Sequence, residues 1–126
     1  MPKHEESLLQ SHFCNWLSAM GYLYNASLAG VNLGPRVGKL RKAMGSRRGF
    51  PDVFIYMPRG KFYGLAIEIK VKGGDIKDEY QLAWQKALNE QGYCAVIAPN
   101  NLNFSDAFNW LRDLVERYMR GECLLT

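Results

Sequence analysis

Apolar and polar residues follow their clearest pattern between Gly49 and Lys72. Two apolar runs in this stretch are separated by Pro58-Arg59-Gly60, a pattern typical of two antiparallel strands joined by a tight turn. If the turn is centred on its arginine and glycine, facing residues have numbers that add to about 119. This register predicts that Asp52 lies opposite Ile67 and beside Glu68.

The second strand of this hairpin carries charge on one face only. Side chains alternate along a strand, so Glu68 and Lys70 share a face. The other face is apolar and comprises Leu65, Ile67, Ile69 and Val71. Two acids and a lysine therefore meet at one strand end, where we expect only partial burial. This arrangement favours an active site. The structural alternative, salt bridges of both acids with Lys70 and Arg48, leaves an acid at position 6 unexplained.

Residues from about 5 to 20 have the periodicity of an amphipathic helix. Its apolar stripe comprises Leu9, Phe13, Trp16, Leu17 and Met20. At about 100° per residue, Glu6 projects into the middle of that stripe, whereas Glu5 lies to one side. An acid in line with a buried face is costly unless it has a partner. Glu6 is therefore a candidate site residue.

Two further helices are predicted in the second half of the chain. One spans about 76–91, with Asp75 and Asp78 as a capping pair and Gly92 as its C-cap. Its expected inward positions are Tyr80 or Gln81, then Trp84, Ala87 and Leu88. The other begins at Ser105 as N-cap and carries Phe108, Leu111, Val115, Tyr118 and Met119 on one face.

Short strands are expected at 22–26 and 93–98, and a short helical piece at 37–44 within the glycine-rich segment 27–48. The order is therefore helix, strand, long loop, hairpin, helix, strand, helix. It predicts an α/β sandwich with a mixed sheet in one domain, residues 1–126.

Positive charge is concentrated before the hairpin. The net charge is +4, and no acidic residue lies between Glu6 and Asp52. The end of that interval holds six cations: Arg36, Lys39, Arg41, Lys42, Arg47 and Arg48. Most charge runs are solvated loops, but basic residues beside a catalytic site favour a polyanionic substrate such as nucleic acid. We interpret this segment as a loop that grips the substrate.

Other function classes are disfavoured. No apolar run reaches the roughly 18 residues of a membrane span, and the first residues form no signal segment, so we expect a cytoplasmic protein. Cys14, Cys94 and Cys123 have no disulfide or zinc spacing and indicate reduced thiols. The two histidines do not form an HExxH or paired pattern, which argues against zinc protease and HNH chemistry.

Carboxylates at a strand end make a hard oxygen site suited to Mg²⁺ or Mn²⁺. Such an ion polarises a phosphoryl oxygen and lowers the pKa of a bound water, while Lys70 can orient the attacking water. The pattern therefore favours metal-dependent phosphodiester hydrolysis.

The motif Pro51-Asp52 followed by Glu68-x-Lys70 resembles the PD-(D/E)xK nuclease superfamily, which has a restriction-endonuclease-like core. Its context, with Gly49-Phe50-Pro51-Asp52, Gln81-x-x-Trp84 and Glu6-x-x-x-Gln10, is similar to the VRR-NUC family. The resemblance implies Asp52, Glu68 and the Ile69 carbonyl as metal ligands and Lys70 as the catalytic lysine. It also implies Glu6 as an accessory acid that contributes to the metal site, and Gln81 as a site residue. Lys72, on the face of Lys70, is a phosphate-binding candidate.

The resemblance also implies a homodimer that cleaves branched DNA, including four-way (Holliday) junctions. The last helix, through Phe108, Trp110 and Tyr118, is a candidate interface; alternatively, it covers the chain's own sheet. Two other functions stay open: a non-catalytic nucleic-acid-binding module with a nuclease fold, and a monomeric flap or nicking nuclease.

Overall fold

The computed structural model describes residues 2–27 and 34–122. Its elements are α1 (Pro2–Met20), β1 (Tyr24–Ala26), α2 (Pro35–Ala43), β2 (Val53–Ile55), β3 (Leu65–Glu68), α3 (Glu79–Glu90), β4 (Cys94–Ile97) and α4 (Phe104–Met119). This succession is the predicted one, and the piece expected at 37–44 is the nine-residue helix α2. Cys123 and the part of the glycine-rich segment around Gly30 lie outside the described residues.

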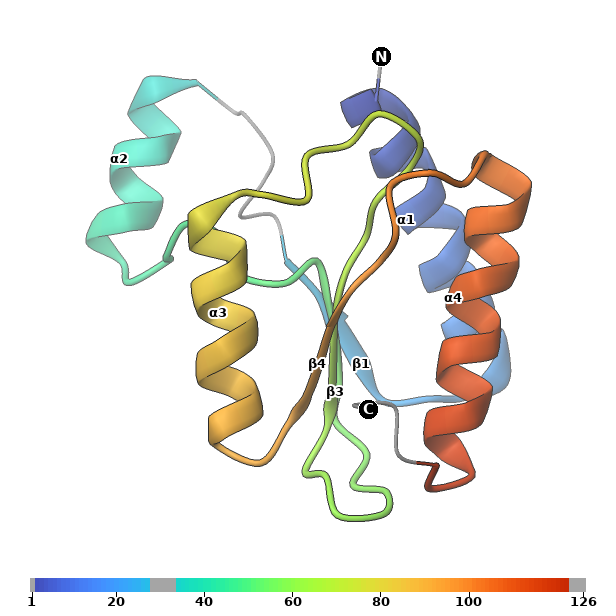
Figure 1. Cartoon of the computed structure of the whole chain (residues 1–126). Coiled ribbons are helices and arrows are strands. Elements are labelled where there is room, and N and C mark those ends of the chain that lie inside the picture. Colours follow the sequence, from blue (N-terminus) through green and yellow to red (C-terminus); the bar gives the residue numbers. More distant parts are fainter. Residues whose placement is uncertain (1, 28–33, 123–126) are drawn as a thin grey trace.

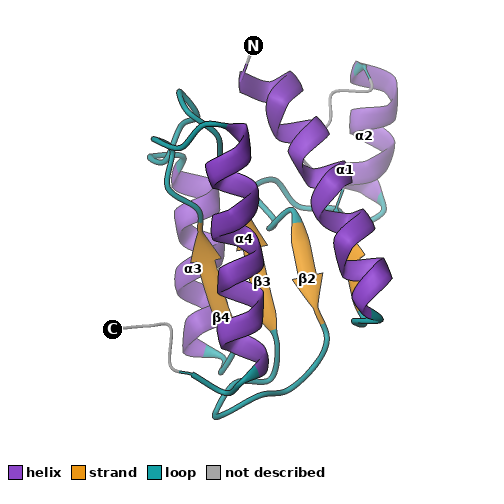
Figure 2. Ribbon diagram, turned by 90° about the vertical axis from the view of Figure 1, so that its right-hand side faces the viewer, coloured by secondary structure: helices purple, strands orange, loops and turns teal. Residues whose placement is uncertain are grey.

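A four-stranded sheet with the order β1-β2-β3-β4 forms the centre of the fold. β1, β2 and β3 pair antiparallel, and β3 pairs parallel with β4. α3 covers one face, and α1 and α4 lie side by side on the other (Figures 1 and 2). The predicted α/β class with a mixed sheet is therefore confirmed. Within the described residues, no helix combines the length and apolar character needed to cross a membrane.

The main core lies between the sheet and the helices α1 and α4. Leu9, Phe13 and Leu17 of the predicted α1 stripe are fully buried there. Met20 was expected on the same stripe, but it lies at the last helical position and is 50 % exposed. The stripe therefore ends one turn before the helix does.

The apolar face of α4 covers the chain's own sheet. Tyr118 is fully buried, and its hydroxyl donates a hydrogen bond to the Met57 carbonyl at 2.8 Å. Phe108 and Trp110 are half-buried and pack against the same core. The proposed dimer interface on this helix is therefore wrong for Tyr118, whose ring is already used within the chain.

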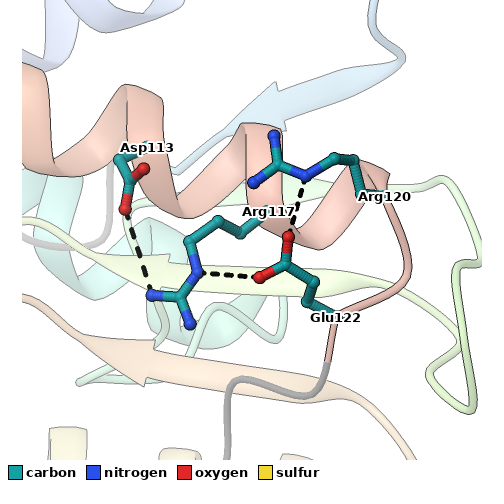
Figure 3. A network of polar contacts seen from close by, with 4 residues as sticks. All are labelled: Asp113, Arg117, Arg120 and Glu122. Carbon is teal, nitrogen blue, oxygen red and sulfur yellow. Dashed lines mark hydrogen bonds and ion pairs between the residues drawn. The ribbon is translucent and has the colours of Figure 1, made fainter.

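Both ends of α4 are fixed by polar side chains. The N-cap is Asn103, which accepts a hydrogen bond from the Asp106 amide at 2.8 Å, so the prediction of Ser105 as the cap is wrong. At the other end, Glu122 accepts from Arg117 at 3.1 Å and from Arg120 at 2.8 Å (Figure 3). These pairs are exposed and add little stability, but they order the chain as it leaves the helix.

The register of the central hairpin differs from the prediction by one residue. Val53 faces Ile67, Phe54 faces Ala66 and Ile55 faces Leu65, so facing numbers add to 120. The connection over 56–64 is also longer than a tight turn, and Arg59 and Phe62 form only an isolated bridge there. Extending the observed register by one residue places Asp52 directly across from Glu68, on the same face.

α3 contacts the sheet through a largely polar face, and none of its residues is buried. Gln81, Trp84 and Leu88 point inward as predicted, whereas Tyr80 and Ala87 are exposed. Asn89 accepts a hydrogen bond from the Ala95 amide at 2.7 Å and donates one to its carbonyl at 3.3 Å. The side chain thus occupies the open edge of β4, which blocks pairing with another strand there.

Candidate active site

Two carboxylates meet where β2 begins and β3 ends. Asp52 accepts a hydrogen bond at Oδ2 from the Ile69 amide at 2.7 Å. The main-chain carbonyl of Asp52 accepts another hydrogen bond, from the Ser27 amide at 2.7 Å, which connects Asp52 to the residue that follows β1. Asp52 therefore continues the β2–β3 ladder with its side chain, and its carboxylate is fixed beside Glu68.

Burial and mutual repulsion strongly disfavour ionisation of this pair. Glu68 is 7 % exposed; burial, followed by the charge of Asp52, raises the pKa of Glu68 to about 10. Burial also raises the pKa of Asp52, although hydrogen bonds from Glu68 and Ile69 and the charge of Lys70 oppose this. Two carboxylates at this separation share a proton. In the metal-free protein the pair therefore resists the loss of its last proton.

Lys70 lies on the same side of the chain as Glu68, two residues further on. Its side chain is only 4 % exposed. The expectation of partial burial is therefore wrong for both Glu68 and Lys70, because the surrounding elements close over this end of the sheet. A buried lysine is tolerated where acidic groups lie near it, and the charge of Lys70 opposes the rise in the pKa of both Asp52 and Glu68.

Glu6 reaches the site from the start of α1. It is half-buried while Glu5 is exposed, as the helical periodicity predicts. Its Oε2 accepts a hydrogen bond from the Val71 amide at 3.4 Å, and its charge adds to the rise in the pKa of Glu68. A Cβ at Gly74 would come within 2.6 Å of that Oε2, so the glycine leaves the space that the carboxylate occupies.

Gln81 contacts the carboxylate pair from the first turn of α3. Its Nε2 donates to Glu68 Oε2 at 3.1 Å, and its Oε1 is buried with no hydrogen-bond partner. The N-cap Asp78 accepts from the amides of Tyr80 and Gln81, which sets the start of the helix and thus the position of Gln81. A buried acceptor without a partner is rare and fits a site that takes up water or a ligand.

The donor set suits a hard divalent cation. Asp52 and Glu68 offer carboxylate oxygens, and Gln81 offers an unused carbonyl oxygen beside them, which are the ligand types that Mg²⁺ and Mn²⁺ prefer. Across the described residues, no three His, Cys, Asp or Glu side chains gather as a ready metal cage. Glu6 lies near the pair, and its part in binding a metal stays a prediction.

The predicted DNA-binding cations occupy two structural settings. Arg36, Lys39 and Lys42 are exposed on α2, and Arg41 is half-buried there. Arg47 and Arg48 follow in the segment that leads to β2, and Lys72 is exposed just after the site lysine. The helix α2 stands apart from the sheet (Figure 1). Part of the expected loop is therefore a cationic helix.

Sequence reasoning missed several residues that support this site. Asn100 fixes the Gly73-Gly74 turn: its side chain donates to the Gly74 carbonyl at 2.7 Å, and its own carbonyl accepts from the Gly73 amide at 3.1 Å. Tyr80 and Trp84 contact arginines, as described below. An asparagine in a turn gives no signal for such a role, whereas two adjacent glycines beside a catalytic motif are a signal of close approach.

No family model matches the sequence, and no curated protein matches it. A solved structure described as a VRR_NUC domain protein superposes with a TM-score of 0.64 at 25% identity, over 88% of this chain and 88% of that one. This chain is therefore similar to a VRR-NUC domain protein in its fold. The resemblance noted from its motifs is thus confirmed, as is the restriction-endonuclease-like fold of the VRR-NUC core.

Glu68→Gln should stabilise the metal-free VRR-NUC-like fold at alkaline pH. Because the pKa of folded Glu68 is raised above that of the unfolded chain, folding takes up a proton, and stability falls as pH rises from about 4.5 toward 10. Glutamine removes this dependence. We expect a melting temperature close to that of wild type at pH 5 and several degrees higher at pH 8.5, measured in EDTA; about 1 kcal/mol corresponds to roughly 4 °C or more.

Glu90→Gln, at an exposed carboxylate of α3, is the matched control and should leave the melting temperature within about a degree of wild type at both pH values. A difference between Glu68→Gln and wild type that does not change with pH would show that Glu68 is ionised in the folded protein.

Proposed function

We propose that this protein is a Mg²⁺- or Mn²⁺-dependent endonuclease that hydrolyses phosphodiester bonds in DNA. The observation that carries the proposal is the placement of Asp52, Glu68 and Lys70 together on one sheet face. Glu68 and Lys70 are buried and Asp52 is half-buried, and the Ile69 amide and Gln81 hold the two carboxyls. A folding device has no need of two adjoining acids whose ionisation is so costly.

In this proposal Asp52, Glu68 and the Ile69 carbonyl hold the ion. The bound ion would polarise a phosphoryl oxygen and lower the pKa of a water beside it. Lys70 orients the attacking water or stabilises the charge that develops on the phosphorane. Gln81 offers its buried Oε1 to water or its amide to phosphate, and Glu6 acts as an accessory acid through its charge.

The substrate we propose is branched DNA, with four-way junctions as the leading candidate. The cations of α2, Arg47, Arg48 and Lys72 would contact its phosphates. A domain with one carboxylate pair cuts one strand, so resolving a junction needs two copies related by a two-fold axis, which a homodimer supplies. We further propose that the protein works in the cytoplasm, where reduced thiols such as Cys14 and Cys94 persist.

Asp52→Ala, Glu68→Ala and Lys70→Ala should each reduce cleavage of a labelled four-way junction by about a hundredfold or more, since each removes a group that acts in the transition state. Because Glu68 and Lys70 are buried, Glu68→Gln and Lys70→Met accompany them as variants that keep the side-chain volume. Single-turnover rates in Mg²⁺ and Mn²⁺ are the measurement, and Ca²⁺ should permit binding with little turnover.

Glu116→Ala, an exposed acid on α4, should cleave at the parent rate. Cleavage by Asp52→Ala close to the parent rate, or robust activity in EDTA, would exclude this mechanism. A wild type that binds junction DNA and never cuts it would favour the non-catalytic binding module.

Replacing Arg36, Lys39, Arg41 and Lys42 of α2 together with glutamine should weaken DNA binding and flatten its salt dependence. For every phosphate that the variant no longer binds, the slope of log K against log salt should fall by about 0.9 on duplex DNA. Fluorescence anisotropy in Ca²⁺ between low and moderate salt measures the slope. Lys61→Gln, outside the proposed DNA-binding set, is the control; an unchanged slope for the α2 variant would make α2 a solvated segment.

Light scattering at micromolar concentration should give about twice the 14.4 kDa of one chain. Paired cuts on a two-fold-symmetric junction require both copies, so the same stoichiometry is expected with junction DNA bound. A mass near 14.4 kDa with and without DNA would leave a monomeric flap or nicking nuclease in place of the dimeric resolvase.

A further inference from the structure

The segment between α2 and β2 is docked tightly on the first two turns of α3. Gly49 has φ +84°, and a Cβ built there would lie 2.6 Å from both the carbonyl carbon and the Cβ of Tyr80. Only glycine tolerates both this backbone conformation and this approach. The position of the preceding arginines relative to α3 is therefore fixed by backbone contact.

Two arginines of this segment lie over aromatic rings of α3. The guanidinium carbon of Arg48 is 4.4 Å from the centre of the Tyr80 ring, and that of Arg47 is 5.5 Å from the Trp84 ring. Trp84 also donates from Nε1 to the Arg48 carbonyl at 3.1 Å. The rings of Phe50 and Trp84 pack in a T-shaped arrangement with their centres 5.0 Å apart. Rings, main chain and guanidinium groups thus form one packed unit.

The in-plane donors of these arginines are not used by carboxylates. Within the described residues, neither guanidinium forms an ion pair, in contrast to those of Arg117 and Arg120 at the end of α4. Both Arg47 and Arg48 are exposed, and a guanidinium that stacks through its face keeps its N–H edge available for a phosphate. Contact with two aromatic rings distinguishes this pair from fully solvated arginines.

The same helix connects this unit to the catalytic carboxylates. Gln81, between Tyr80 and Trp84 in sequence, donates to Glu68. Four residues after Arg48, the chain reaches Asp52, so the arginines are tied to the carboxylate pair from both sides. A group bound by these arginines would be held at a fixed place relative to the site.

We propose that Arg47 and Arg48, held on Trp84 and Tyr80, form a preformed phosphate-binding site for the DNA backbone beside the scissile phosphate. This inference rests on the proposed nuclease function. Tyr80 and Trp84 act as positioning residues: they restrict the arginine rotamers before DNA arrives, which lowers the ordering cost of binding. Arg48→Lys would keep the charge and remove the planar guanidinium that lies over the Tyr80 ring.

A double-mutant cycle on Arg48 and Tyr80 tests this directly, with anisotropy of a labelled four-way junction in Ca²⁺. Arg48→Ala should weaken binding and lower the salt slope by about 0.9. Tyr80→Leu should weaken binding about two- to fivefold, the equivalent of one exposed cation–π contact. The double variant should bind no more weakly than Arg48→Ala alone, because Tyr80 acts through Arg48.

Cleavage kinetics and further variants distinguish a positioning role of the aromatic rings from a loss of folded structure. In Mg²⁺, Tyr80→Leu should raise KM by a similar factor with kcat within about twofold, and Arg48→Lys should bind more weakly with an unchanged salt slope. Trp84→Phe keeps a ring and removes the donor to the Arg48 carbonyl, so it should weaken binding with a melting temperature near that of wild type.

The control is Lys61, whose Nζ lies 5.7 Å from the centre of the Phe62 ring. It belongs to the connection between β2 and β3, at the opposite end of these strands from the carboxylates. Lys61→Ala removes a comparable cation–π pair and should leave DNA affinity unchanged. Additive effects of Arg48→Ala and Tyr80→Leu, or wild-type affinity in both, would overturn this inference while the nuclease function stands. A wild type that neither binds nor cleaves DNA would remove both.

Discussion

The antiparallel register of β2 and β3 is the constraint on which the rest of the site depends. The numbers of facing residues add to 120, so even-numbered residues of both strands share one face of the sheet and odd-numbered residues share the other. Val53, Ile55, Leu65 and Ile67 therefore enter the main core, and Asp52 joins Glu68 on the opposite face. A slip by one residue would direct Asp52 into that core. The Ile69 amide, bound by the Asp52 carboxylate at 2.7 Å, secures the register at the point where the main-chain ladder ends.

The consequence of this register is a costly concentration of charge at one end of the sheet. The buried Glu68 and the half-buried Asp52, both with raised pKa values, lie beside the buried Lys70, and a further acid approaches from α1. Such a cluster opposes folding of the metal-free protein, and it persists because several elements over-determine it: Gln81 from α3, the Ile69 amide from the end of β3, and Glu6 from the start of α1. Strain of this kind is typical of functional sites.

Two glycines let these elements approach closely. Gly49 allows the arginine-bearing segment to lie against the backbone of α3, and Gly74 leaves room for the Glu6 carboxylate. One links the site to the surface where DNA would bind, and the other links it to α1. α3 is shared by both halves of this arrangement, since it carries Gln81 toward Glu68 and the rings of Tyr80 and Trp84 toward the arginines.

The sequence by itself determined the order of elements, the mixed α/β class, the buried stripe of α1 and the anomaly of Glu6 within it, because helical and strand periodicities are local properties of the backbone. It also determined which acids and which lysine are candidates. Only the tertiary structure decided the register, since the connection over 56–64 is not the tight turn that Pro58-Arg59-Gly60 indicates. Burial of Lys70, the use of Tyr118 within the chain's own core, and the contacts of Arg47 and Arg48 with α3 were likewise decided there. Each of these depends on which distant segment covers a given face, and no local pattern of residues encodes that contact.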